Sequence, residues 1–341
     1  MTDHWKFFLE RSGAVFAGAR LLGFGAPERE NQALAECEVI CDLSGLGVIA
    51  ASGPNAATFL QGQLSNDIRE VTPQRSHLSA YCNPQGRMLA ILRLFQRDDV
   101  YYLRLPSELV EAMLKRLRLF VLRAKAELHD ASNGLVRVGA SGSHAAALLQ
   151  AYLGELPHTT DDVVQARGIS AIRLPDPRPR FEMHGAAAAL EPLWTALAGE
   201  LQPVGADAWR WLDIQAGIPT IYPATSGVFI PQMANLHLLN GVSFKKGCYT
   251  GQEIVARSQY LGKLKRHLLG ARTEGRTQPN VGDEVFLSTA PSSDAIGTIL
   301  DASRDPRGGY ALLAIVQDEV AEQELVLKTG EPLQRLPLPA R

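Results

Sequence analysis

The first part of the chain alternates short apolar runs with turn-forming residues, which is the pattern of antiparallel strands. An apolar run at 47–52 precedes Gly53-Pro54, and Ala56, Leu60 and Leu64 then recur at helical spacing. Strand-like runs follow at 77–83, 87–95 and 100–105, and then a helix from Ser107, its predicted cap, to about Leu119, with Leu109, Met113 and Leu117 facing inward. This region predicts an antiparallel meander with helices packed on it.

The pattern changes at about residue 134, where strands and helices alternate. Strands are predicted at 135–140, 169–174 and 180–183, and helices at 144–152 and 187–201. The order strand, helix, strand, strand, helix suggests a ferredoxin-like unit with its helices on one face of the sheet. We therefore expect residues 134–203 to form a domain of this type.

Beyond this unit, the pattern predicts one helix and then a small β domain. The helix covers 207–217 and carries Trp209, Leu212 and Ala216 on one face, and an irregular stretch at 218–240 follows it. After Lys265, short β runs such as 285–287, 296–300 and 311–316 are separated by Gly, Pro, Asn and Ser. Such spacing predicts a closing β-barrel at the C-terminal end.

Length and composition narrow the class of protein. A chain of 341 residues indicates two or three domains, and 46% hydrophobic with 21% charged residues is typical of globular proteins. The formal net charge of −2 does not point to nucleic acid or membranes as partners. No signal peptide or membrane-spanning run is present, and four cysteines are too few for a disulfide framework. We therefore expect a reduced, cytoplasmic setting.

The segment 246–253, Lys-Gly-Cys-Tyr-Thr-Gly-Gln-Glu, carries the strongest chemical signal. Thr250 and Glu253 have the spacing of a capping box, and Tyr249 and Ile254 have that of a hydrophobic staple. Both patterns predict a helix that starts at Thr250 and continues one face through Ile254, Ser258 and Leu261.

This assignment places Cys248 two residues before a helix N-terminus, next to Lys245 and Lys246. Helix N-termini and nearby cations favour the thiolate, so Cys248 is predicted to be a reactive thiol. Gly247 and Gly251 would leave the backbone accessible or allow unusual torsions. An alternative stays open, in which Tyr249, Gln252 and Glu253 merely begin a helix.

The wider segment 245–266 is strongly basic. It contains six basic residues and the single acid Glu253; the basic residues are Lys245, Lys246, Arg257, Lys263, Lys265 and Arg266. Such a local patch suits an anionic ligand, although a solvated helix face explains it as well.

Other polar and aromatic candidates are weaker. The Cys37-x-x-x-Cys41 spacing fits one face of a helix, and no second Cys/His pair completes a metal site, so no bound metal is predicted. Cys82 alternates with apolar neighbours and is predicted to be core. A Cys–His nucleophile would need a base such as His77, His237 or His267, but the sequence does not bring one to Cys248.

Trp209 and Trp211 lie close together in the predicted helix. An indole can stack on a flat heterocycle such as a pterin, or it can anchor a helix in the core. The residues alone leave both interpretations open. No phosphate-binding P-loop or dinucleotide fingerprint is present, which argues against a nucleotide-driven mechanism.

Several segments together resemble the YgfZ-type folate-binding proteins, which are relatives of the aminomethyltransferase known as the glycine cleavage T protein. The motif 244–253 is similar to that family's signature, and the further matches span most of the first 270 residues in family order; they are 59–64 with Asn66-Asp67, 82–88, 216–219, 229–232 and Asn235-Leu236.

The resemblance implies an α+β chain with three domains arranged like a clover leaf around a tetrahydrofolate site. Residues 1–133 with 204–260 would form the folate-binding domain that carries the cysteine motif, 134–203 the ferredoxin-like domain and 261–341 the β-barrel. It also implies that Trp209 contacts folate, and that a second folate-linked tryptophan of some members falls near Leu46, where this chain has none.

The function implied is assembly, maintenance or repair of iron–sulfur proteins, including radical enzymes that thiomethylate tRNA, without direct binding of nucleic acid. The aminomethyltransferases have an acidic pair after an Asn-x-x-Gly-Gly turn, whereas this chain has Ala90 and Ile91 at the corresponding positions. Because the catalytic carboxylate is missing, the usual aminomethyl transfer is not expected. Two alternatives remain: a folate-dependent one-carbon transferase with altered chemistry, and a non-catalytic scaffold for iron–sulfur clients.

Overall fold

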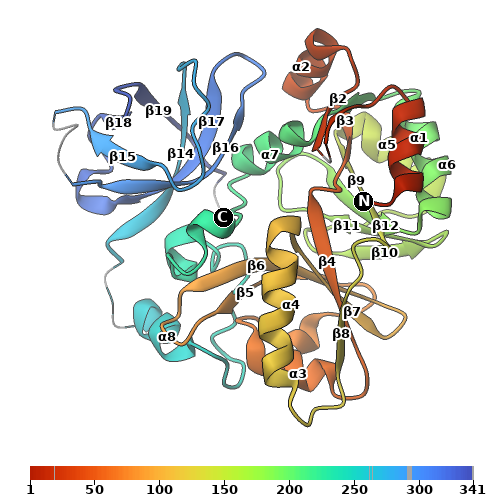
Figure 1. Cartoon of the computed structure of the whole chain (residues 1–341), viewed down its shortest axis with the longest axis horizontal. Coiled ribbons are helices and arrows are strands. Elements are labelled where there is room, and N and C mark those ends of the chain that lie inside the picture. The colour runs from red at the N-terminus through yellow and green to blue at the C-terminus, as the bar shows by residue number, and fades with distance from the viewer. Residues whose placement is uncertain (19, 261, 263, 290–293, 340–341) are drawn as a thin grey trace. The chain divides into compact units, whose positions relative to one another are not determined.

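The computed structural model describes residues 1–18, 20–260, 262, 264–289 and 294–339, and Figure 1 labels its elements. The chain forms two compact units. The first comprises Met1–Ala56, Arg69–His77 and Arg93–Trp209, and the second comprises Ala57–Ile68, Leu78–Leu92 and Arg210–Arg341. The mixed α+β class with antiparallel sheets, predicted from the sequence, is confirmed.

A six-stranded sheet dominates the first unit, with the order β10-β11-β12-β9-β3-β13. The strands are β3 (Val39–Asp42), β9 (Val136–Ser141), β10 (Val163–Ala166), β11 (Ile169–Arg173), β12 (Arg180–Gly185) and β13 (Gln202–Val204), and the helices between them are α5 (Ser143–Leu153) and α6 (Ala187–Ala198). The predicted strands and helices are present in the predicted order, but the structure adds the strand β10 between α5 and β11, which was not predicted. The sheet also includes β3, which comes from far upstream and lies between β9 and β13.

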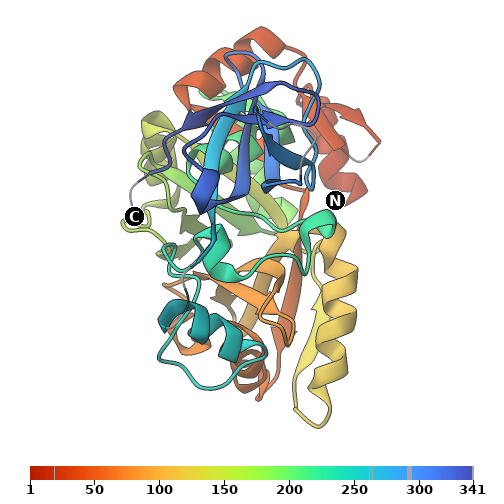
Figure 2. The same cartoon turned by 90° about the vertical axis from the view of Figure 1, so that its left-hand side faces the viewer.

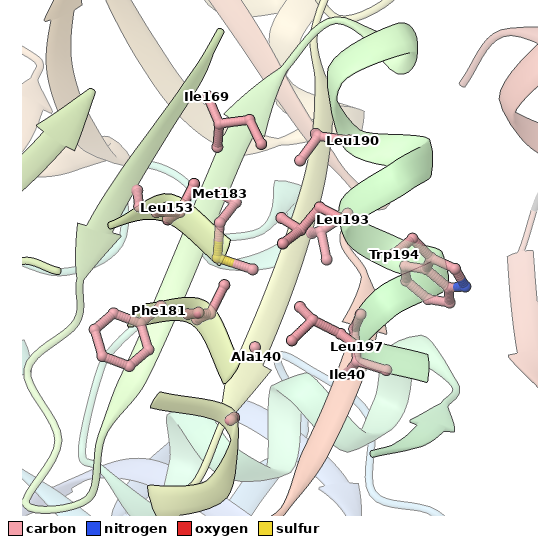
Figure 3. Packing of buried hydrophobic residues seen from close by; sticks show 14 of the residues in the cluster. Ile40, Ala140, Leu153, Ile169, Phe181, Met183, Leu190, Leu193, Trp194 and Leu197 are labelled. Carbon is pink, nitrogen blue, oxygen red and sulfur yellow. The ribbon is translucent and has the colours of Figure 1, made fainter. Parts of the chain in front are cut away.

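One face of this sheet packs under helices and forms a continuous apolar core. Phe181 and Met183 alternate along β12 on this face, and Leu190, Leu193 and Leu197 project from α6 toward it (Figure 3). Helix α1 (Asp3–Arg11) adds Trp5 and Leu9 to the same core. The Trp5 indole N–H donates to Asp42 Oδ1 at 2.7 Å, so the buried indole is satisfied.

The residues of β12 between these apolar positions are Arg180, Glu182 and His184, all fully buried. Arg104 donates to Glu182 through two nitrogens, with Nε–Oε1 and Nη2–Oε2 distances of 3.1 and 3.0 Å. His184 Nε2 lies 2.9 Å from Glu182 Oε1. These contacts hold the pKa of Glu182 well below its usual range, with Arg104 as the strongest opposing influence to burial, whereas burial lowers the pKa of His184. The sequence analysis did not identify this buried ion pair.

A second sheet has the order β5-β6-β7-β4-β8, in which β5, β6 and β7 form the predicted meander and β4 and β8 continue the sheet beyond β7. Its strands are β4 (Leu46–Ser52), β5 (His77–Cys82), β6 (Met88–Arg97), β7 (Val100–Pro106) and β8 (Glu127–Asp130). Strand β6 passes from the second unit into the first, where residues 93–97 pair with β7. Helix α4 (Ser107–Val121) lies along β4 and β8 in both views (Figures 1 and 2).

The two helices of this region begin at positions that the sequence pattern did not fix, and the predicted cap of α4 is wrong by one residue. Helix α3 (Ala56–Gln63) begins after Pro54, because Gly53 takes a φ of +97° and residues 53–55 form a turn. Ser107 is the first residue of α4 and not its cap, since Pro106 occupies the capping position without a side-chain hydrogen bond. The predicted inward residues Leu109, Met113 and Leu117 are buried.

The remaining elements of the first unit are short. They are β1 (Val15–Ala17), β2 (Arg20–Gly23), α2 (Pro27–Glu36) and the 3₁₀ turn η1 (Ile68–Glu70), whose first residue belongs to the second unit. Within the described part of the chain, no helix is long and apolar enough to cross a membrane.

The second unit ends in a closed barrel with the order β14-β17-β16-β15-β18-β19, which confirms the predicted C-terminal β-barrel. The strands are β14 (Arg266–Thr273), β15 (Glu284–Leu287), β16 (Gly297–Arg304), β17 (Tyr310–Gln317), β18 (Leu325–Leu327) and β19 (Pro332–Leu336). Helix α7 (Ala206–Gln215), which begins in the first unit, η2 (Pro223–Thr225), η3 (Pro231–Ala234) and α8 (Gln252–Tyr260) precede the barrel, and η4 (Asp318–Val320) lies within it. Arg210 of α7 donates to Asp301 of β16, which also accepts from Tyr222.

Candidate functional site

The cysteine motif lies on a loop that leads into α8, which begins at Gln252, two residues later than predicted. The first helical bond runs from the Val255 N–H to the Gly251 carbonyl, and Gly251 has a φ of +82°. Thr250 therefore does not cap the helix, and the predicted capping box is wrong. Instead, the Gln252 side-chain oxygen accepts from the Tyr249 N–H at 3.2 Å and closes the loop on itself.

Gly251 is packed against the turn that joins β5 to β6. A Cβ atom at Gly251 would lie 2.4 Å from the Asn83 carbonyl oxygen and 2.8 Å from Gly86 Cα. The Asn83 side chain accepts from the N–H groups of Gln85 and Arg87, which fixes this turn. The sequence placed the turn and the motif in separate segments, whereas the fold brings them into contact.

Alanine at Gly251 is therefore expected to destabilise the protein by about 2–3 kcal/mol, because it adds left-handed backbone strain to a steric clash. Gly247 in the same loop is the matched control, since its Cβ would meet no atom within 4 Å. We expect Gly247→Ala to change stability by less than about 0.5 kcal/mol. Urea unfolding of both variants would measure the difference, and equal effects would contradict the packing argument.

Lys246 fixes the other side of the motif. Its ammonium donates to three backbone carbonyls, those of Gln61, Leu64 and Asn66, at 2.6, 2.6 and 3.0 Å. Gln61 lies in the last turn of α3 and Leu64 directly follows the helix, where carbonyls lack helical partners and attract a cation. Its Nζ also lies 5.1 Å from the centre of the Tyr249 ring. Lys246 thus ties the loop to α3.

Tyr249 turns inward between these two anchors and is 9% exposed. Burial raises the pKa of its hydroxyl, and the nearby Cys82 raises it further. Burial in β5 also raises the pKa of the Cys82 thiol to about 12, so Cys82 remains a protonated core residue at neutral pH. The predicted core position of Cys82 is confirmed.

Cys248 is exposed, in contrast to the three buried cysteines. Among the residues that the structure describes, no hydrogen bond reaches its sulfur, and neither His237 nor His267 bonds to it. His267 Nδ1 instead lies 2.5 Å from Asp318 Oδ1. The loop therefore presents an accessible thiol from a backbone that is held on both sides.

The basic residues of the segment 245–266 differ in how they are placed. Lys245, Arg257 and Lys265 are exposed, whereas Lys246 is occupied by α3. Arg266 is half-buried and Glu253 is exposed. Leu261 and Lys263, which the sequence assigned to the helix face and the basic patch, lie outside the described residues.

Cys37 and Cys41 do not share a helix face, and that prediction is wrong. Cys37 ends α2 in a left-handed conformation, and Cys41 lies in β3. The sulfur of Cys37 accepts from Arg178 at 2.6 Å, and Cys41 donates to the Gly205 carbonyl at 3.4 Å. Both thiols are enclosed by protein groups.

Trp209 is 4% exposed and lies in the core of the first unit. A Cβ at Gly139 of β9 would fall 2.5 Å from the indole ring, and the guanidinium carbon of Arg180 lies 4.4 Å from a ring centre. The ring is therefore packed tightly against β9 and covered by Arg180, an arrangement typical of a core anchor. Leu46 begins β4 and is half-buried.

Ala90 and Ile91 lie in β6 and are 0% and 6% exposed. Both positions are filled by apolar side chains in a closely packed strand. Neither side chain carries a group that can accept a proton.

Comparisons with known proteins agree with this architecture. Residues 12–172 match the family described as the GCVT N-terminal domain. The structure of the glycine cleavage system aminomethyltransferase T from Bartonella henselae aligns with a TM-score of 0.79 and 19% identity, covering 97% of this chain and 95% of that chain.

Two other structures align poorly and support no argument. The heterotetrameric sarcosine oxidase from Corynebacterium sp. U-96 gives a TM-score of 0.36 at 12% identity, covering 51% of this chain and 90% of that one. The aspartate kinase from Synechocystis gives 0.25 at 12% identity, covering 47% and 27%. The chain thus has the fold of the glycine cleavage aminomethyltransferase T, and its residues 12–172 match the GCVT N-terminal domain.

Proposed function

We propose that this protein binds tetrahydrofolate, or a one-carbon derivative of it, and helps to assemble, maintain or repair iron–sulfur proteins through Cys248. Its clients would include radical enzymes that thiomethylate tRNA. The observation that carries the proposal is the contrast among the thiols: Cys248 is exposed on an anchored loop, whereas Cys37, Cys41 and Cys82 are buried. An accessible thiolate can ligate iron or attack the disulfide of another protein, and a buried thiol is inert.

The folate part of the proposal is supported by the match to the GCVT N-terminal domain and by the shared fold. A folate contact of Trp209, and one near Leu46, belong to the same proposal. Because Arg180 covers the Trp209 ring, a pterin would have to meet the edge of this indole or displace the guanidinium. Trp209→Phe should weaken tetrahydrofolate binding in calorimetric titration, and urea unfolding of the same variant should show a loss of stability as well, because the ring is 4% exposed and packed in the core.

The buried apolar pair Ala90 and Ile91 supports a loss of the aminomethyl-transfer chemistry. In an enzyme of that type, a carboxylate moves a proton at the reacting centre. We therefore assign the chemistry to the Cys248 thiol, which would either ligate iron transiently or attack a disulfide of a client, forming a mixed disulfide and releasing one client thiol.

A rescue experiment tests the role of Cys248. A strain that lacks this protein should regain thiomethylated tRNA and iron–sulfur enzyme activity with the wild-type chain but not with Cys248→Ala or Cys248→Ser. Gln259→Ala, at an exposed position on α8, is the control and should rescue fully. Calorimetric titration with tetrahydrofolate should give the same affinity for Cys248→Ala as for the wild type.

Normal rescue by Cys248→Ala would refute the cysteine mechanism. Turnover of methylene- or formyl-tetrahydrofolate by the purified protein, abolished by the same substitution, would instead identify a one-carbon enzyme. Failure of every variant and the wild type to bind tetrahydrofolate would refute the folate part alone.

A further inference from the structure

The C-terminal end of α4 exposes an unusual number of large apolar side chains. Leu119 is 67% exposed, Phe120 is 44% exposed and Leu122, at the end of the helix, is 86% exposed. These three residues follow one another closely and are not scattered over the unit. We refer to residues 115–129, which contain them, as the α4–β8 surface. Clustered exposed apolar groups commonly mark a binding site for another molecule.

A groove of about 700 Å³ lies within this surface. Its walls are formed by the last turn of α4, the following loop and β8; the lining residues are Arg118, Leu119, Val121, Leu122, Ala126, Glu127, Leu128 and His129. The loop that joins α4 to β8 can be followed in Figures 1 and 2. A concave surface of this size accommodates inserted side chains.

The charge around the groove is mainly positive, although Glu127 is one of the lining residues. Residues 112–126 contain five basic residues and no acidic residue, in a chain whose net charge is −2. Lys115, Arg123 and Lys125 are exposed, and Arg116 lies 5.9 Å from the centre of the Phe120 ring. A partner with negative charge around an apolar centre is complementary to this arrangement.

The backbone of Leu122 is strained in a way that keeps its side chain in solvent. Its φ and ψ are +46° and −108°, a region that a bulky residue seldom occupies. Glycine would adopt a positive φ without this strain, so leucine at this position costs stability and exposes an apolar group. Insertion of the Leu122 side chain into a partner would bury the apolar group and offset the free energy of the backbone strain.

Strand β8 lies at the end of its sheet, and an open edge can accept an added strand. Here, however, Arg118 donates from Nε and Nη2 to the Leu128 carbonyl at 3.1 and 2.7 Å. The edge is therefore partly capped. Recognition through side chains in the groove is favoured over strand addition.

We propose that the α4–β8 surface is a docking site for an acidic protein segment that carries apolar anchor side chains. The groove receives the anchors, Leu119 and Leu122 cover them, and Lys115, Arg123 and Lys125 pair with the surrounding carboxylates. This inference concerns binding of a protein partner and does not depend on folate or on Cys248.

Fluorescence anisotropy of labelled peptides tests the proposal with the full-length protein. The probes are peptides of about sixteen residues in which Leu and Phe recur at helical spacing among Glu residues, each paired with a version that has Lys in place of Glu. The acidic peptides should bind, more weakly as salt is raised, and the Lys versions should not. Lys115→Glu with Arg123→Glu should weaken binding at least about tenfold.

Leu122→Gly separates binding from folding. It should weaken peptide binding at least about tenfold while the melting temperature stays equal or rises, because the substitution removes the backbone strain. Leu238→Ser and Lys328→Glu, at exposed positions in the second unit, are controls that should leave binding unchanged.

Three outcomes would overturn the proposal. The first is that acidic peptides bind no better than their Lys versions, or that they bind the Leu122→Gly protein as tightly as the wild type. The second is binding to vesicles of phosphatidylcholine and phosphatidylserine that depends on Leu122 while no peptide binds. The third is a dimer in sedimentation that the Leu122→Gly substitution dissociates.

Discussion

Replacing Glu182 by alanine is expected to lower the free energy of unfolding by about 3–5 kcal/mol, because Arg104 is then left charged and without its carboxylate partner in the core. Glu182 is fully buried and Arg104 is 12% exposed. The two-pronged contact between them satisfies both groups in a place that is largely shielded from water. Removing one partner leaves the desolvation cost of the other uncompensated.

A double-substitution cycle distinguishes a broken ion pair from a simple cavity. If the loss comes from the unpaired guanidinium, Arg104→Met combined with Glu182→Leu should lose much less than the two single changes added together. Urea unfolding of the four proteins measures this coupling. Additive losses would show that the pair contributes only through packing. His184 also contacts Glu182. The same cycle, with His184→Phe in place of Arg104→Met, measures how strongly the histidine and Glu182 depend on each other for stability.

Replacing Lys246 by methionine is expected to cost about 2–3 kcal/mol and to loosen the loop that carries Cys248. The substitution keeps the length of the side chain but removes three charged hydrogen bonds to Gln61, Leu64 and Asn66. The carbonyls at the end of α3 then lack the cation that satisfied them. Lys245 is the matched control, since it is adjacent in sequence but exposed.

The measurement for Lys246 has two parts. Urea unfolding gives the change in stability, which for Lys245→Met should stay below about 0.5 kcal/mol. Alkylation of Cys248 by a maleimide, followed by mass spectrometry, reports how the loop presents the thiol. If the two lysine variants behave alike in both assays, the anchoring role of Lys246 is refuted.

Periodicity in the sequence predicted most strands and helices of this protein to within a few residues. Apolar runs bounded by Gly, Pro and Asn identified β4 to β7, and the run-and-turn pattern after Lys265 identified the barrel. These features are local, because they depend on side chains that alternate at a period of two or recur at about 3.6 along one segment. Leu109, Met113 and Leu117 fell on the buried face of α4 for the same reason.

Local sequence pattern predicted element boundaries less accurately where the backbone departs from standard torsions. The T-x-x-E spacing indicated a helix start at Thr250, yet Gly251 takes a positive φ and α8 begins after it. The cause is tertiary, since Gly251 must fit against the Asn83 carbonyl. The sequence does contain a pattern that indicates the buried ion pair, although it was not used. Arg180, Glu182 and His184 alternate with Phe181 and Met183, and this alternation places the polar groups together on one face of a strand.

Local sequence pattern was enough to predict β4 to β7, β9, β11, β12, the helices α3 to α7, the C-terminal β-barrel and the unusual motif around Cys248. It did not predict α1, α2, β1 to β3, β8, β10 or β13. Tertiary structure decided how that motif is held. Only the fold places Lys246 at the end of α3, Gly251 against the 83–86 turn, and Glu182 within reach of Arg104. Secondary structure follows from neighbours along the chain, whereas the partner of a buried charge is fixed by packing between segments far apart in sequence.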